Sequence, residues 1–362
     1  TKKLQQDLEH VSKLDLDVQI VGDKHSGFQC IIYNLSQKTY LRTILNLVSQ
    51  YELAKDSAVK ADVLKKISEL SNQPFSPDRK HYNLGSNLGL PYFLRLSKDG
   101  NKIIAKGLEL GALLGRKLQV RNDERSLVVN RLVTGRIDNK RLAEAGYGVE
   151  TVFKQIHIDK YKQACLHISL DLSGSMSGRK WEQTLQMTAA IAKAATYVRN
   201  LRIQVSLRTS DSMSRGKDQP VLIMGYDSKF NDMRHFVDIM SAVHPSGCTP
   251  EGLCFDALVK QNYIQQSNSE CTSYFLNISD GEPGMSGWGG YHAVDFTRKS
   301  VQKMQNELGV NVISFYVQEG GSYALKQPSE TFRKMYGKDS RIVDANNVIQ
   351  IARELNAKFL SE

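Results

Sequence analysis

Three short segments of the sequence are rich in oxygen-bearing side chains of the kind that bind metal ions. DLSGSMSG begins at residue 171, directly after an apolar-rich run at 165–170 that is typical of a buried strand. PSGCTPEG spans residues 245–252, and NISDGEPG spans residues 277–284. Together they present two carboxylates and three hydroxyls: Asp171, Ser173, Ser175, Thr249 and Asp280. Oxygen ligands without histidine or cysteine suit Mg²⁺, Mn²⁺ or Ca²⁺ and disfavour Zn²⁺.

An alternating pattern of strands and helices after about residue 165 predicts how these segments come together. Strand candidates lie at 165–170, 203–208, 221–225, 273–278, 310–317 and 341–343, with amphipathic helices between most of them. This alternation predicts an α/β fold with a mainly parallel central sheet flanked by helices on both faces. Ligands of such sheets bind at the carboxyl ends of the strands, where Asp171 and Asp280 are expected.

The donor set also predicts an ion with an open position. Only two of the five donors carry charge, and the hydroxyls stay neutral, so positive charge remains on the ion. Mg²⁺ keeps several waters in its octahedral shell, and an Asp or Glu from a partner protein would replace one of them. The competing interpretation is turn chemistry, in which Asp and Ser side chains bond only to their own loops.

The three segments resemble those of a known family. DLSGS matches the DxSxS signature of the metal-ion-dependent adhesion site (MIDAS) of von Willebrand factor A (VWA) domains, and Thr249 and Asp280 match its other elements in order. The resemblance implies a Rossmann-like VWA domain over residues 165–362. It also implies that Ser173, Ser175 and Thr249 are direct or conformation-dependent ligands, while Asp171 and Asp280 bind directly or through water.

A narrower resemblance indicates a class of partner. The stretches at 134–146, 170–182, 276–283 and 341–360 resemble the CobT-type VWA subunit of aerobic cobaltochelatase and the VWA partners of MoxR-type ATPases. The resemblance implies a AAA+ ATPase partner of MoxR or CobS type, and copies that resemble this family also occur in phage genomes. Two features depart from chelatase subunits, because the long acidic segment before the VWA domain is missing and the chain carries a net charge of +10.

Three functions therefore stay open. The first is an adaptor that couples a AAA+ ATPase to a target through the metal, and the second is a CobT-like subunit of a cobalt chelatase in cobalamin biosynthesis. The third is a nucleic-acid-associated VWA protein, which the basic segment 106–141 favours because it holds nine Lys or Arg against four acidic residues. That segment equally suits a solvated helical face or a protein-docking surface. No GxxxxGK[ST] motif is present, so we expect no ATP hydrolysis and no catalytic centre in this chain.

The first 150 residues are predicted to form a mostly helical domain. Apolar residues recur at helical spacing over 39–52 and 57–70, and an extended pair is expected at 16–21 and 29–34. A hairpin is predicted over 92–105, with Asp99 and Gly100 in its turn.

The composition favours the cytoplasm. No apolar stretch is long enough to cross a bilayer, and the first residues lack the apolar core of a signal peptide. The five cysteines form no CxxC pair, which fits reduced thiols.

Overall fold

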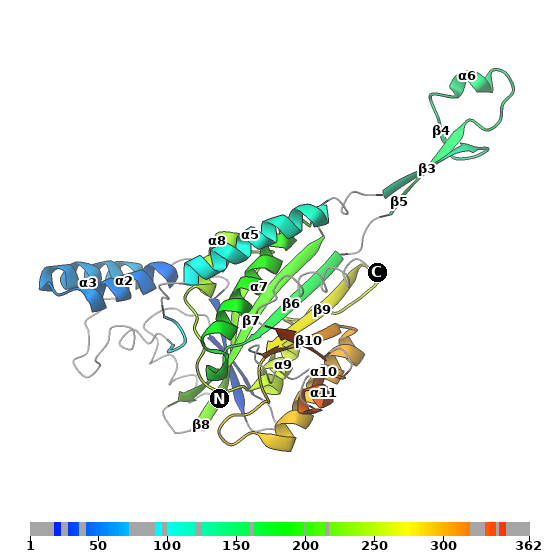
Figure 1. Cartoon of the computed structure of the whole chain (residues 1–362). Coiled ribbons are helices and arrows are strands. Elements are labelled where there is room, and N and C mark those ends of the chain that lie inside the picture. The colour runs from blue at the N-terminus through cyan, green and yellow to red at the C-terminus, as the bar shows by residue number, and fades with distance from the viewer. Residues whose placement is uncertain are drawn as a thin grey trace.

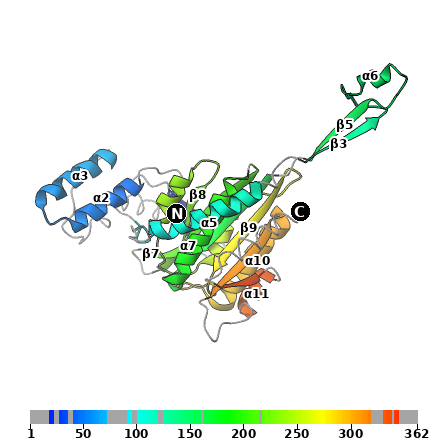
Figure 2. The same ribbon diagram turned by 45° about the horizontal axis from the view of Figure 1, so that its top comes forward.

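The computed structural model describes residues 18–22, 28–35, 41–71, 91–95, 100–119, 125–159, 163–198, 200–213, 217–318, 330–337 and 340–344. These residues form a layered α/β body and a narrow β-arm that projects from it (Figure 1). In Figure 2 the arm again extends away from the body, on the side opposite helices α2 and α3.

An eight-stranded sheet forms the centre of the body, in the order β1-β2-β8-β7-β6-β9-β10-β11. Its strands are β1 (Val18–Gly22), β2 (Gln29–Asn34), β6 (Gln163–Asp171), β7 (Leu201–Met213), β8 (Lys217–Asp227), β9 (Cys271–Ser279), β10 (Asn311–Gln318) and β11 (Ser340–Asp344). The pairs from β7 through β6, β9 and β10 to β11 are all parallel, whereas β8 is antiparallel to β7 and β1 to β2. The predicted mainly parallel sheet is confirmed, and all six strand candidates belong to it.

Each face of the sheet has its own hydrophobic core. Helices α5 (Gly100–Gln119), α7 (Arg179–Ala195) and α8 (Met233–Met240) pack over one face, where Ile104, Leu185 and Phe236 join one buried cluster. Helices α9 (Glu251–Lys260), α10 (Gly290–Leu308) and α11 (Glu330–Tyr336) contribute to a second cluster. The predicted helices on both faces are therefore confirmed (Figure 1).

The hairpin predicted over 92–105 is wrong, because the chain from Gly100 onward is the helix α5. Gly107, Gly111 and Gly115 recur every fourth residue of α5. Gly107 and Gly111 face the backbone of α7, and Gly115 faces the ring of Tyr197 just after it, so the two helices lie very close. A Cβ atom on Gly111 would lie 2.5 Å from the carbonyl oxygen of Ala190. A tertiary contact thus explains glycines that, read locally, only lower the expectation of a helix.

The amino-terminal part contributes both to this sheet and to separate helices. Helices α2 (Leu41–Leu53) and α3 (Ser57–Ser71) lie where helical spacing predicted them, and β1 and β2 form the predicted extended pair. Strand β2 pairs in parallel with β8, so this pair extends the main sheet. A distinct helical domain over residues 1–150 stays a prediction.

The β-arm consists of β3 (Arg125–Leu132), β4 (Arg136–Ile137), β5 (Phe153–Asp159) and the short helix α6 (Leu142–Ala145). Its strands pair antiparallel in the order β3-β5-β4. The basic segment 106–141 is consequently divided, since its first part lies in α5 and its last part in the arm. None of the helices described here has the length and apolar character needed to cross a membrane.

Candidate metal centre

Asp171 is the last residue of β6, a strand that is paired on both sides within the sheet. Its side chain is fully buried. Oδ1 accepts a hydrogen bond from the backbone N–H of Ser173 at 2.9 Å, and Oδ2 accepts one from Ser279 Oγ at 2.8 Å. Burial raises the pKa of Asp171, while the nearby Arg208 and the Ser279 bond act in the opposite direction. A bound cation would favour the ionised carboxylate in the same way.

A single 3₁₀ turn, Gly174–Met176, follows and reverses the chain. It brings the hydroxyls of Ser173 and Ser175 to 2.9 Å from each other. Ser175 Oγ donates to Asp280 Oδ1 at 2.8 Å, across 105 residues of sequence. Asp280 directly follows the carboxyl end of β9, which is the strand beside β6. Four predicted donors thus lie along one edge of the sheet, joined through these bonds.

Thr249 is held at the same edge by its backbone. The N–H of Gly174 donates to the carbonyl oxygen of Gly247 at 3.0 Å, which ties the first loop to the Thr249 loop. Thr249 and Gly284 exchange two backbone hydrogen bonds, of 3.0 and 2.9 Å, which tie it to the Asp280 loop. Gly247 has φ of 78°, and an added Cβ would lie 2.5 Å from the carbonyl oxygen of Ser210. This tight turn therefore requires glycine.

The donor set fits a hard divalent cation. Asp171, Ser173, Thr249 and Asp280 are each less than 9% exposed, so their oxygens are already withdrawn from bulk water. Two carboxylates and neutral hydroxyls are the ligands that Mg²⁺ and Mn²⁺ accept, with water completing the shell. Among the described residues, no group of three or more His, Cys, Asp or Glu side chains could hold a metal ion. The candidate set contains only two such side chains, those of Asp171 and Asp280, and its other donors are hydroxyls. The ligand roles themselves stay a prediction.

A buried ion pair lies beneath this edge, and sequence reasoning missed it. Arg208 on β7 and Glu251 at the start of α9 are fully buried, with 2.6 Å between Nη2 and Oε1. Arg208 also donates to Ser169 Oγ at 3.0 Å, and Asn277 donates to Glu251 at 3.0 Å. Burial raises the pKa of Glu251, and Arg208 opposes that shift. Two features of the sequence could have indicated this pair: Arg208 lies inside a strand candidate, and Glu251 follows Thr249 by two residues.

Lys180 is another residue that the sequence analysis did not single out. It lies in the first turn of α7, and its Nζ is 2.6 Å from Asp280 Oδ2. Its position five residues after Ser175 was visible in the sequence, but its contact with Asp280 was not.

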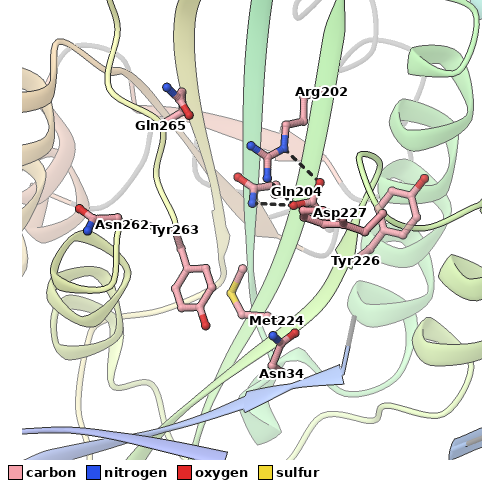
Figure 3. A pocket seen from close by; sticks show the side chains of 10 residues that line it. Asn34, Arg202, Gln204, Met224, Tyr226, Asp227, Asn262, Tyr263 and Gln265 are labelled. Atoms are coloured by element: carbon pink, nitrogen blue, oxygen red, sulfur yellow. Dashed lines mark hydrogen bonds and ion pairs between the residues drawn. The ribbon is translucent and has the colours of Figure 1, made fainter. Parts of the chain in front are cut away.

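A cavity of about 150 Å³ lies at the opposite edge of the sheet, near the start of β7 (Figure 3). Arg202 and Asp227 form an ion pair in its wall, with 3.1 Å between Arg202 Nε and Asp227 Oδ1, and Gln204 donates to the same carboxylate at 3.0 Å. Asp227 raises the pKa of Arg202. None of the five predicted metal ligands lines this cavity, so it is separate from the candidate centre.

No protein-family model matches the sequence, and no curated protein matches it either. Solved structures similar to the chain include the von Willebrand factor domain of the type V pili tip protein Mfa5 from Porphyromonas gingivalis. That match has 9% identity and a TM-score of 0.41, over 55% of this chain and 97% of that one.

Two further structures are similar over about half of this chain. The ArnB paralog VWA2 from Sulfolobus acidocaldarius matches at 13% identity with a TM-score of 0.33, over 54% of this chain and 47% of that one. The manganese-loaded TRAP protein of Plasmodium vivax matches at 14% identity with a TM-score of 0.33, over 52% of this chain and 72% of that one.

Proposed function

We propose that residues 165–362 form a VWA domain whose MIDAS binds Mg²⁺ or Mn²⁺ and uses the ion to hold an acidic side chain of a partner protein. The proposed ligands are Asp171, Ser173, Ser175, Thr249 and Asp280. One observation carries the proposal. Oxygen donors from two loops lie together at the carboxyl ends of β6 and β9, and backbone hydrogen bonds tie the loop of Thr249 to both.

The charge of the centre supports a binding function. A divalent cation held by two carboxylates and neutral hydroxyls keeps water in its remaining positions. A carboxylate from a partner protein can replace one of these waters. When bound, the ion supplies a strong positive charge at the surface. The residues of this chain hold and orient the donors.

The proposed partner is a AAA+ ATPase of MoxR or CobS type, or the target protein of such an ATPase, in the cytoplasm. The segments 134–146 and 341–360 support this choice through their resemblance to CobT-type subunits. In this function the chain is an adaptor that couples the ATPase to its target. A cobalt chelatase would be one assembly of this kind.

Direct ion binding tests the first part of the proposal. Isothermal titration of the full chain with MnCl₂ or MgCl₂ should show one site, and Asp171→Asn should weaken binding strongly because it removes one of two carboxylates. Asp138→Asn is the matched control, since it removes a carboxylate from the β-arm. Equal affinity of the wild type and Asp171→Asn would contradict the assignment.

Partner binding tests the second part. A MoxR- or CobS-type ATPase should co-purify with the chain in Mg²⁺, and EDTA or Asp171→Asn should release it. The coupling function is wrong if the same ATPase stays bound under both conditions.

A further inference from the structure

Lys180 contacts the candidate metal centre from the first turn of α7. Its Nζ lies 2.6 Å from Asp280 Oδ2 and 3.4 Å from the backbone oxygen of Ser175. The Lys180 side chain is 23% exposed, whereas that of Asp280 is 1% exposed. The ammonium group is therefore the part of this ion pair that can leave the site for solvent.

The requirements of the helix do not account for Lys180. The amino end of a helix carries partial positive charge, so a lysine in the first turn of α7 is placed unfavourably. Gly178 precedes the helix with φ of 79° and ψ of −135°, a backbone conformation that favours glycine. Asp280 supplies the interaction that offsets the unfavourable position of Lys180.

Both carboxylate oxygens of Asp280 are engaged. Ser175 Oγ donates to Oδ1 at 2.8 Å, and Lys180 donates to Oδ2. A divalent cation that used Asp280 as a ligand would lie within a few ångströms of the Lys180 ammonium. Like charges at such a distance, in a site withdrawn from water, repel each other strongly.

We propose that Lys180 is a built-in competitor of the metal ion. The ammonium and the ion compete for Asp280, so Lys180 lowers the affinity of the centre and is released when the ion binds. This inference rests on the metal-binding function proposed above. Once released, the ammonium stays tethered beside the centre by its flexible four-carbon stem. It then adds a second positive charge for the acidic side chain of a partner, so that partner recognition depends on metal loading.

Metal affinities of charge variants provide the first test. Isothermal titration of the full chain with MnCl₂ should show about tenfold tighter binding, or more, for Lys180→Gln than for the wild type, because one repulsive charge is removed. Lys180→Arg keeps the charge and should bind no more tightly than the wild type. Lys154→Gln is the matched control, because Lys154 also pairs with a carboxylate, Asp138, but lies in the β-arm.

The release of Lys180 provides a second test that needs no variant. Lysine acylation of the wild-type chain, followed by mass spectrometry, should show faster labelling of Lys180 when Mn²⁺ is added and an unchanged rate at Lys154. Labelling of Lys180 that stays constant or slows with Mn²⁺ would overturn the inference.

The two proposals fail in distinguishable ways. Equal Mn²⁺ affinity of the wild type and Lys180→Gln, or weaker binding by the variant, overturns the role of Lys180 and leaves the metal centre standing. No binding of Mn²⁺ or Mg²⁺ by either protein overturns both. If only Lys180→Gln binds Mn²⁺, the result supports the proposal and shows that the Lys180 ammonium excludes the ion from the wild-type centre.

Discussion

The two ends of β6 lead into opposite kinds of structure. At the carboxyl end, Asp171 is buried and accepts hydrogen bonds from Ser173 in the following loop and from Ser279 at the end of β9. At the amino end, about 26 Å away for a nine-residue strand, the chain comes from the β-arm. The arm holds eight of the fourteen large apolar side chains that are exposed among the described residues: Val128, Val129, Val133, Ile137, Leu142, Tyr147, Val149 and Ile156.

The difference shows how long-range contacts define one region and local pairing the other. At the edge of the sheet that carries the candidate metal centre, here called the metal edge, the contacts that join separate elements are long-range. Arg208 and Glu251 are 43 positions apart, and Ser175 and Asp280 are 105 apart. In the arm, Val152 and Asp138 are the buried residues among those whose side chains are described. Changes near the metal edge should therefore cost stability, whereas matched changes in the arm should not.

Arg208→Met should produce the largest effect. It leaves the Glu251 carboxylate fully buried without its partner, which typically costs about 3–5 kcal/mol of unfolding free energy. Guanidinium unfolding would measure the loss. Arg136→Met in the arm is the matched control and should leave stability unchanged, since Arg136 is exposed. The double variant Arg208→Met/Glu251→Leu should recover part of the loss, and a double variant less stable than Arg208→Met would contradict this account.

Acidification should weaken the body through His167. Burial lowers the pKa of His167 from 6.5 to about 4, so below pH 6.5 the unfolded chain binds a proton that the folded chain does not. Stability from this group is complete above pH 6.5 and falls by about 3 kcal/mol as the pH drops towards 4.

Unfolding free energies of the wild type and His167→Asn at several pH values would measure that contribution. The difference isolates His167 from Asp171 and Glu251, whose raised pKa values act with the opposite sign. If the two proteins lose stability equally as the pH falls, His167 has the same pKa in the folded and the unfolded chain, and the prediction is wrong.

Gly111→Ala should have a moderate effect. The new methyl group would meet the backbone oxygen of Ala190 at 2.5 Å and Lys193 Cβ at 2.6 Å, so α5 must move away from α7. Such overpacking costs about 1–3 kcal/mol. Gly146→Ala is the control in the arm, because Gly146 has right-handed helical φ and ψ and its added methyl meets no atom closer than 3.4 Å. Thermal unfolding that ranks the two variants in the reverse order would contradict the close contact of these helices.

Removal of the arm should have the smallest effect. Replacement of residues 125–159 by a short Gly/Ser linker should change the unfolding free energy by less than about 1 kcal/mol, because the strands of the arm pair with one another and not with the main sheet. Mn²⁺ affinity should also stay at the wild-type value. A loss of several kcal/mol, or a changed affinity, would show that the two ends of β6 are not independent.

Local signals in the sequence predicted much of the fold. Apolar runs bounded by turn residues located the six strands after residue 165, because burial in a sheet demands such runs. The signal failed at 92–105, where Asp99 and Gly100 suggested a turn. The glycines that follow are used instead for the close contact of α5 with α7, and that contact requires a partner about 80 residues away.

The candidate ligands show the same division. The types and spacing of Asp171, Ser173 and Ser175 could be read from a single loop. Thr249 and Asp280 were found in two further loops that the strand pattern predicted at the same edge, and the family resemblance supported the set. No local pattern indicated that Lys180 would reach Asp280 or that Arg208 would lie buried with Glu251.

The sequence by itself determined the donor chemistry and the alternation of strands and helices, because both depend on residue type and short-range spacing. The tertiary structure alone decided which charged side chains lie next to the oxygen donors. Lys180, in the first turn of α7, and Asp280, directly after β9, are 100 residues apart in sequence, and the fold brings Nζ within 2.6 Å of Oδ2. Charge pairing depends on distance in space, and the packing of helices on a sheet sets that distance.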